Sequence, residues 1–227
     1  MSGPTVLPDP PAQATTVFGD RLELACEFAR VLASDAITRG LIGPHEVPRL
    51  WDRHLLNCAV VAELLPPDAR VVDVGSGAGL PGIAFAIRRA DLRVDLVEPL
   101  QRRAVFLDEV VQRLGLAATV TVVRGRAEER AVLATVAPVE WVTARAVAPL
   151  DRLVRWCLPM LQPGGTLLAL KGASAATEVR EHLLIMNSLG GRDIDVIECG
   201  VGVLEQPTAV VRVRRNTTAR RGVKGHG

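Results

Sequence analysis

The sequence predicts an α/β fold, a seven-stranded and mostly parallel sheet preceded by an N-terminal helical cap. After residue 66, short β-branched segments alternate with helical patterns, and this alternation is typical of a parallel sheet covered on both faces by helices. Before residue 66, apolar residues recur at helical spacing. The chain has 227 residues, of which 48% are apolar and 23% charged, so it can bury a sizeable core without disulfides or metals.

The elements are expected in the following order. Helical spacing over 22–32 and over 46–65 predicts the two main helices of a cap that spans 20–65. An α/β core follows over 68–213 and forms a single domain with the cap. The predicted strands are 71–74, 92–97, 119–123, 141–143, 166–170, 194–198 and 209–213. The helices predicted between them are 80–89, 100–114, 126–133, 150–161 and 173–189.

Both ends of the chain are expected to lie outside the domain. Residues 1–19 are rich in Pro and Ala and predict a flexible segment, and 214–227 predict a flexible basic tail. From Arg212 onward there are six basic residues and no acidic one, although the whole chain has a net charge of only +2. Such a tail suits either nucleic-acid phosphates or a solvated end, and the sequence leaves both interpretations open.

A cytoplasmic protein is expected. No apolar stretch reaches the roughly 18 residues of a membrane span, and residues 1–16 lack the charged and apolar parts of an export signal. The four cysteines form no CxxC pair, so neither a zinc site nor a redox dithiol is predicted. We therefore expect reduced cysteines, no metal and no membrane contact.

A glycine loop follows the first predicted strand, where open parallel sheets bind their ligands. Gly75, Gly77 and Gly79 let the backbone turn sharply and approach a ligand closely. Gly77, Gly79 and Gly82 also fit the GxGxxG pattern of dinucleotide-binding proteins. A nicotinamide-dependent dehydrogenase is therefore one interpretation of this loop.

Two neighbouring residues favour S-adenosylmethionine over a dinucleotide. Asp73 lies in the strand before the loop, where its carboxylate can organise the loop and attract the cationic methionine end of that cofactor, but would repel a pyrophosphate. Pro81 lacks a backbone N–H that a pyrophosphate would use. Both residues are also ordinary in strands and turns, so the prediction depends on the acid that follows.

That acid is Glu98, which closes the second strand 23 residues after Gly75 and can accept hydrogen bonds from ribose hydroxyls. A surface acid at a strand end is the structural alternative. After the third strand, Ala127 and Glu128 are placed to bring a small side chain and backbone amides near an adenine ring. Here the alternative is a helix N-terminus with an ordinary Glu in its first turn.

Residues 143–150 follow the fourth strand, the position at which nucleic-acid methyltransferases of this architecture present their substrate contacts. The chain has no Tyr, no Asn/Asp-Pro-Pro-aromatic run and no Pro-Cys pair. These absences disfavour methylation of the adenine amino group and covalent methylation at a pyrimidine carbon. Acceptors that already carry a lone pair, such as guanine N7, need alignment more than a base.

Three further cations or potential cations are candidate site residues. Lys171 ends the fifth strand, and it is one of only two Lys among 27 basic residues. Its ammonium suits a phosphate or a base acceptor, or alternatively caps the sheet edge. Arg53 and His54 lie in the cap and point about 100° apart on a helix, so at most one faces the cleft. A lone helical His is more often packed than catalytic, so no chemistry is assigned to it.

Together these motifs resemble one family, the small-subunit ribosomal RNA guanine-N7 methyltransferases, also called glucose-inhibited division protein B. The resemblance covers about residues 20–213. It rests on Arg53-His54, Asp73 to Ile83 with Gly-Leu-Pro-Gly-Ile, Leu96 to Leu100, Arg102-Arg103, Phe106-Leu107, Arg126-Ala127-Glu128, Arg145-Ala146 and Ala169 to Gly172. It departs from the family in two places, with Ala78 where many members have Pro and Glu98 where others have Asp.

The resemblance implies a class I methyltransferase fold, S-adenosylmethionine as methyl donor, and a guanine in the 530 loop of 16S rRNA as acceptor. It also implies that the enzyme acts on the small ribosomal subunit, and a monomer without a metal is expected. The implied cofactor-binding residues are Asp73, Gly75, Gly77, Gly79, Leu80, Glu98, Ala127, Glu128 and Arg145. The implied RNA-binding residues are Arg53, His54, Arg145 and Lys171, with Arg145 and Lys171 also taken as catalytic.

Three rival functions stay open at this point. A dehydrogenase would use Gly77, Gly79 and Gly82 for a dinucleotide. A non-catalytic RNA or ribosome-assembly protein would keep a vestigial pocket. A small-molecule or protein methyltransferase would share the fold, because a fold does not determine a substrate.

Overall fold

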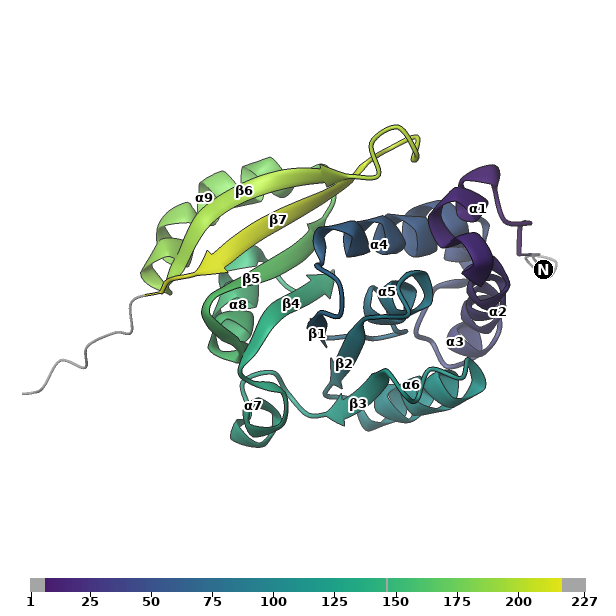
Figure 1. Cartoon of the computed structure of the whole chain (residues 1–227), viewed down its shortest axis with the longest axis horizontal. Coiled ribbons are helices and arrows are strands. Elements are labelled where there is room, and N and C mark those ends of the chain that lie inside the picture. Colours follow the sequence, from purple (N-terminus) through teal and green to yellow (C-terminus); the bar gives the residue numbers. More distant parts are fainter. Residues whose placement is uncertain (1–6, 146, 218–227) are drawn as a thin grey trace, which may run out of the picture.

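The structure is a computed structural model that describes residues 7–145 and 147–217. Within these residues, seven strands form one sheet in the order β3-β2-β1-β4-β5-β7-β6 (Figure 1). Strand β7 runs antiparallel to β5 and β6, and the pairs from β3 to β5 are all parallel. The strands are β1 (Arg70–Val74), β2 (Arg93–Glu98), β3 (Val120–Arg124), β4 (Val139–Arg145), β5 (Leu161–Lys171), β6 (Gly191–Cys199) and β7 (Thr208–Arg215). The predicted seven-stranded, mostly parallel sheet is confirmed.

Helices cover both faces of the sheet and create two apolar cores. One core lies under the cap, α5 and α6, and the other under α7, α8 and α9. Val71 packs in the first core and Val72 in the second, and both are fully buried, which explains why β1 is rich in apolar residues on both faces. The helices are α5 (Gly82–Arg88), α6 (Gln101–Arg113), α7 (Arg130–Val136), α8 (Leu150–Cys157), η5 (Leu158–Met160) and α9 (Ala175–Ser188).

The cap is a series of short helical segments, and it lies at the opposite end of the molecule from α9 (Figure 1). The first predicted helix is observed as α2, but the second is divided into 3-10, π and α turns. Pro44 and Pro48 supply no backbone N–H, which interrupts regular hydrogen bonding where this second segment begins. The segments are α1 (Ala12–Phe18), η1 (Gly19–Arg21), α2 (Leu22–Ala33), α3 (Asp35–Thr38), η2 (Pro44–Arg49), η3 (Leu50–Leu56), α4 (Asn57–Ala59) and η4 (Val60–Leu64).

The N-terminal segment differs from the expectation of a flexible stretch over 1–19. Residues 12–18 form α1, whose Val17 and Phe18 side chains are buried in the core of the cap. The Trp51 indole N–H also donates to the Pro8 carbonyl at 3.0 Å, which ties the preceding residues to η3. Two apolar side chains within this Pro- and Ala-rich segment are therefore part of the core of the cap. Residues 1–6 lie outside the described residues.

The basic C-terminal region is also partly built into the fold. Arg212 and Arg214 lie in β7 and pair across to β6, with Arg212 2.6 Å from Asp195 and Arg214 3.7 Å from Asp193. These cations are neutralised within the sheet, so they are not part of a free tail. The expected flexible tail over 214–227 overlaps β7 at Arg214 and Arg215, and its residues 218–227 lie outside the described residues.

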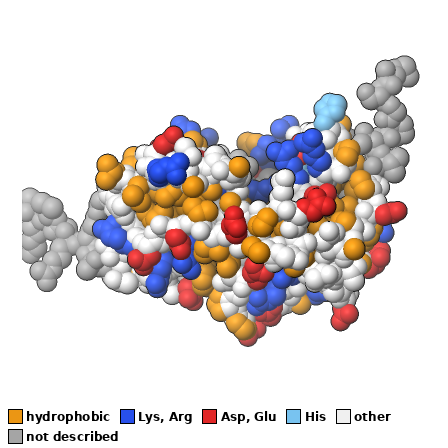
Figure 2. Space-filling model, turned by 90° about the horizontal axis from the view of Figure 1, so that it is seen from above, with side chains coloured by type: hydrophobic (Ala, Val, Ile, Leu, Met, Phe, Trp, Pro, Cys, Tyr) orange, Lys and Arg blue, Asp and Glu red, His pale blue; other side chains and the backbone are white. Residues whose placement is uncertain are grey.

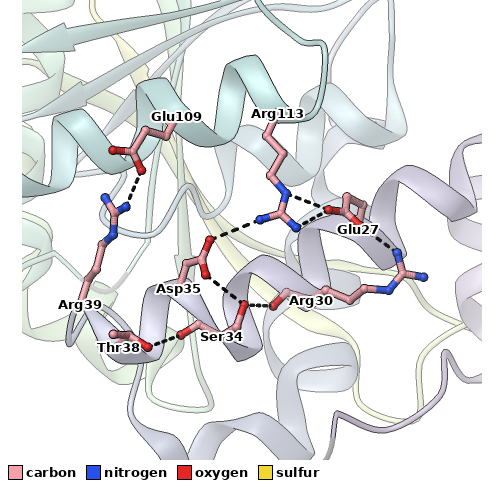
Figure 3. Close-up of polar contacts among 8 residues, drawn as sticks. All are labelled: Glu27, Arg30, Ser34, Asp35, Thr38, Arg39, Glu109 and Arg113. Carbon is pink, nitrogen blue, oxygen red and sulfur yellow. Dashed lines mark hydrogen bonds and ion pairs between the residues drawn. The ribbon is translucent and has the colours of Figure 1, made fainter.

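A cluster of ion pairs joins the cap to α6 (Figure 3). Arg113 of α6 lies 2.6 Å from Glu27 and 3.3 Å from Asp35, while Arg39 lies 2.5 Å from Glu109. These side chains are largely exposed, and exposed pairs contribute at most about 1 kcal/mol each. The cap is thus held mainly by its apolar core, and the ion pairs fix its register on α6.

No helix among the described residues is both long and apolar enough to cross a membrane. All four cysteines are free. Three of them, Cys58, Cys157 and Cys199, are buried.

Candidate active site

A cavity of about 580 Å³ lies between the carboxyl edge of the sheet and the cap. It opens where β1 and β4 lie side by side and the chain crosses in opposite directions to β2 and β5, which is the usual ligand position in an open α/β sheet. Its volume is in the range of cofactor sites. It is lined by Leu41, Ile42, His54, Val74, Gly75, Ser76, Gly77, Ala78, Leu80, Val97, Glu98, Pro99, Leu100, Arg103, Arg126, Ala127, Glu128, Arg145, Val147 and Trp156.

The glycine loop is held against the end of β2 by backbone hydrogen bonds. The amides of Gly75 and Ser76 both donate to the Val97 carbonyl, at 2.8 and 3.2 Å. Gly75 has a φ of +74°, and a Cβ there would lie 2.7 Å from a methyl group of Val147. Glycine is therefore required at position 75 by both the backbone conformation and the approach of the loop after β4.

Glu98 joins the first two loops of the cavity. Its carboxylate accepts hydrogen bonds from the amides of Gly77 and Leu100, each at 3.0 Å, and the residue is 1% exposed. A dinucleotide pyrophosphate needs the amides of this loop as donors, but the Gly77 amide already faces an acid. The structure therefore favours a ligand that offers hydroxyl groups or positive charge beside Glu98.

Asp73 supports the loop from beneath and does not line the cavity. Its Oδ2 accepts from the Gly82 amide at 3.0 Å, its Oδ1 has no hydrogen-bond partner among the described residues, and burial raises its pKa to about 7. A Cβ at Gly82 would lie 2.4 Å from Leu96 and 2.8 Å from the Asp73 carboxylate, so only glycine fits there. Asp73 was expected to contact the cofactor directly, but its position outside the cavity lining does not support such a contact.

Gly79 is also outside the cavity lining. It has a φ of +94° and packs against Ile83 of α5, where a Cβ would lie 2.4 Å from the terminal carbon of Ile83. Gly79 therefore shapes the turn into α5, and this position does not support the expected contact with a cofactor. Leu80 and Gly77 do line the cavity.

The loop after β3 completes the cofactor side. Ala127 is buried and Glu128 is exposed, and both line the cavity beside Leu100. The Gly125 amide donates to the Glu98 carbonyl at 3.2 Å, which fixes this loop to the end of β2. The predicted residues Glu98, Ala127 and Glu128 thus meet along one wall.

The opposite wall is formed by the cap and the end of β4. The guanidinium of Arg145 donates to three acceptors of the cap, the Cys58 thiol at 3.0 Å, the Arg53 carbonyl at 3.1 Å and His54 Nδ1 at 2.8 Å. The other ring nitrogen of His54 lies 2.7 Å from Glu46. Burial and the charge of Arg145 lower the pKa of His54, and burial raises the pKa of the Cys58 thiol.

Of the adjacent pair in the cap, only His54 faces the cavity. The Arg53 side chain is 59% exposed and lies 3.8 Å from Glu46, outside the lining. The expectation that at most one of the two faces the cleft is confirmed.

Lys171 lies elsewhere than expected. Its side chain is 10% exposed, and its ammonium donates to the Ala148 carbonyl at 2.9 Å and pairs with Glu178 of α9 at 2.8 Å. It does not line the cavity, so the structure does not present it as a free cation for RNA. The sequence showed the ammonium at the sheet edge, but not that a carboxylate seven residues later in the chain would neutralise it.

Sequence reasoning missed several residues of this site. Glu46 and Cys58 hold His54 and Arg145, Val147 packs on Gly75, and Trp156 of α8 lines the cavity. Glu46 lies eight positions from His54, but the partners of Cys58 and Val147 lie far away in the sequence, so no local motif specifies these contacts. Ala146, part of the Arg-Ala motif, lies outside the described residues.

The residues of the cavity fit S-adenosylmethionine. The buried carboxylate of Glu98 suits ribose hydroxyls, the apolar surfaces of Leu100 and Ala127 suit an adenine ring, and Gly75 permits close approach. The fold and the site together define a class I S-adenosylmethionine-dependent methyltransferase.

A model of the GidB family, described as rRNA small subunit methyltransferase G, matches residues 21–205. The chain belongs to this family. A ribosomal RNA small subunit methyltransferase G from Salinispora arenicola is 59% identical over 95% of this chain and 91% of its own length. The protein of the same name from Rhodococcus jostii is 55% identical over 91% and 90%.

Among solved structures, Aeropyrum pernix fibrillarin in complex with natively bound S-adenosyl-L-methionine matches with a TM-score of 0.51 and 18% identity. The match covers 71% of this chain and 74% of fibrillarin. At this identity the likeness concerns the fold. It confirms the class I methyltransferase architecture that the sequence predicted.

Proposed function

We propose that this protein transfers the methyl group of S-adenosylmethionine to N7 of a guanine in the 530 loop of 16S rRNA, within the small ribosomal subunit. The observation that carries the proposal is the cavity at the carboxyl edge of the sheet, which has buried Glu98 on one wall and a fixed arginine, Arg145, on the other. Membership in the GidB family supports ribosomal RNA as the acceptor.

The cofactor half of the cavity would hold the methyl donor. S-adenosylmethionine supplies an electrophilic methyl group carried on a sulfonium sulfur. Glu98 would accept from the ribose hydroxyls, and Leu100, Ala127 and Glu128 would surround the adenine. Gly75, Gly77 and Leu80 would face the methionine part, where the absence of a Cβ at Gly75 leaves room.

The acceptor half has to align a guanine rather than remove a proton. Guanine N7 already carries a lone pair, so the reaction forms an N7–carbon bond, breaks a sulfur–carbon bond and leaves the purine cationic. Of the five N–H donors of Arg145, three are directed to the cap. One of the remaining two would serve guanine O6, which leaves N7 free.

RNA phosphates would be contacted outside the cavity. Arg53 is the exposed cation beside His54, and Arg126 is an exposed cation at the lining itself. Figure 2 shows Lys and Arg side chains gathered beside a hollow in the surface of the molecule. Such a surface attracts the RNA backbone in a salt-dependent manner.

We further propose that the protein acts as a monomer, without a metal, in the cytoplasm.

Methyl-labelled S-adenosylmethionine tests the proposal directly. The protein is incubated with small ribosomal subunits that lack the modification, and the label is located by nuclease digestion of the 16S rRNA. We expect label on guanine N7 in the 530 loop, and none on subunits that already carry the modification. Label on another base, or no transfer despite cofactor binding, would overturn the substrate assignment; the same assay with naked 16S rRNA distinguishes free RNA from an assembled subunit.

A further inference from the structure

We propose that His54 is a positioning residue for Arg145, which it holds by acting as a neutral hydrogen-bond acceptor whose tautomer is set by Glu46. This inference deepens the proposed function, because it assigns how the acceptor wall of the cavity is kept in place. It also replaces the expectation that His54 contacts the RNA.

The hydrogen-bond geometry allows one protonation state of His54. An arginine side chain has donors only, so His54 Nδ1, at 2.8 Å from the Arg145 guanidinium, must present its lone pair. The other ring nitrogen, Nε2, lies 2.7 Å from the carboxylate of Glu46 and must carry the proton. The neutral ring protonated at Nε2 satisfies both contacts, whereas the imidazolium would direct an N–H at the guanidinium.

The charged groups around His54 favour this neutral state. Glu46 faces it from η2, Arg53 from its own segment η3, and Arg145 from β4. Burial has the largest effect and lowers the pKa of His54, and Arg145 lowers it further, while Glu46 acts in the opposite direction. The net direction is downward, so His54 is neutral around pH 7.

The other two acceptors of Arg145 do not titrate near neutral pH. The Arg53 carbonyl has no protonation equilibrium, and burial raises the pKa of the Cys58 thiol, which therefore stays protonated. His54 is thus the one contact of the three that is lost on mild acidification. As the pH falls through the lowered pKa of His54, Arg145 loses a partner and gains a repulsive neighbour.

The protonation state of His54 can be measured without any activity. We would label the histidines with 15N and follow the imidazole nitrogens of the full-length chain by NMR during a pH titration. We expect the Nε2–H tautomer at neutral pH. Arg145→Ala should raise the pKa of His54 because it removes a cation, and Glu46→Gln should lower it because it removes the anion that raises it. An Nδ1–H tautomer, or an imidazolium at neutral pH, would overturn the inference.

The consequence for catalysis is measured by single-turnover methyl transfer to small subunits across the pH range in which histidine titrates. His54→Ala should slow transfer roughly tenfold to a hundredfold, the usual cost of losing a hydrogen bond to a charged group. His54→Asn places an amide oxygen near the position of Nδ1, so it should restore most of the rate at neutral pH and abolish the loss of rate in acid.

His45→Asn is the matched control, because His45 is an exposed histidine of the same cap outside the cavity lining, and its rate and pH profile should equal those of the wild type. Equal impairment of His54→Ala and His54→Asn would contradict the acceptor role. A rate of methyl transfer that still falls at acidic pH in His54→Asn would contradict it too. A wild-type chain that transfers no methyl group, yet shows the expected tautomer and pKa changes, would overturn the proposed function and leave the His54–Arg145 contact established.

Discussion

The wall of the cavity formed by the loops after β1 and β2 is held by backbone amides, whereas the wall formed by the cap and the end of β4 is held by side chains. On the first wall, the amides of Gly75, Gly77 and Leu100 donate to Val97 and Glu98. On the second, Arg145 reaches across to the cap through its guanidinium. Substitutions and changes of pH should therefore affect the two walls differently.

A wall built from backbone contacts has little room for adjustment. Its glycines are fixed by positive φ angles or by neighbours closer than a Cβ allows, as at Gly75 and Gly82. A wall built from side-chain contacts responds to single substitutions, because side chains have several rotamers, and it responds to pH through His54. In the proposed methyltransferase this division would place the cofactor on the rigid wall and the guanine acceptor on the adjustable one.

The largest effect is expected from Gly75→Asp. The Cβ of the new side chain would lie 2.7 Å from Val147 at a φ of +74°, and the substitution would add an acid next to the cavity. Overpacking and backbone strain together should weaken S-adenosylmethionine binding about a hundredfold or more. Isothermal titration calorimetry with the cofactor measures this directly.

Gly40→Asp is the control for backbone strain alone. Gly40 has a φ of +66°, but its Cβ position has no described neighbour within 4 Å and it lies outside the cavity lining. Cofactor affinity should be unchanged in that variant. Wild-type affinity in Gly75→Asp would show that the cofactor binds somewhere other than this cavity.

The next effect concerns the buried acid beneath the rigid wall. Burial raises the pKa of Asp73 to about 7 from its ordinary value of 3.8, so the folded chain favours the protonated form. Below about pH 4 both the folded and the unfolded chain are protonated, and above about pH 7 the folded chain must bury a charge. The wild type should therefore lose stability relative to Asp73→Asn as the pH rises from about 4 to 7, by up to about 4 kcal/mol.

Urea unfolding of the cofactor-free chain at several pH values measures this difference. The amide oxygen that Asp73→Asn introduces can still accept from the Gly82 N–H, so the variant should keep the contact that Asp73 makes at 3.0 Å. If the free energies of unfolding of the two proteins ran parallel over this pH range, Asp73 would not be protonated on folding.

The rigid wall could be predicted from the sequence because local patterns encode it. The glycines, the strand that precedes them and Glu98 lie within one β-α-β unit, and their spacing is fixed by that unit. The position of Asp73 was harder to infer. Alternation along β1 puts it on the same face as Val71, beneath α5, and this excludes it from the cavity.

The side-chain wall could not be predicted in the same way. The contact between His54 and Arg145 joins residues 91 positions apart, and no local periodicity specifies it. Helix α1 was missed because Val17 and Phe18 are too few to form an apolar pattern, although the cap buries both. Both the His54–Arg145 contact and helix α1 depend on packing between segments that lie far apart in the sequence.

The smallest effect is expected from Lys171→Met, which tests whether this cation positions a loop or binds RNA. Lys171 holds the Ala148 carbonyl in the loop after β4, and Val147 of that loop packs on Gly75. Loosening the loop should slow methyl transfer about threefold to tenfold. Glu178→Gln should have a similar effect, since it breaks the same ion pair from the other side.

The salt dependence of binding to small subunits separates the two roles of Lys171. A lysine that neutralises a phosphate contributes about one unit to the slope of log affinity against log salt. Because the Lys171 side chain is 10% exposed and its ammonium is already paired, Lys171→Met should leave that slope unchanged. Arg53→Ala, which removes a side chain that is 59% exposed, should reduce the slope by about one. A reduced slope in Lys171→Met would mean that the ion pair with Glu178 opens when RNA binds, and the side-chain wall would then include Lys171 as a direct contact.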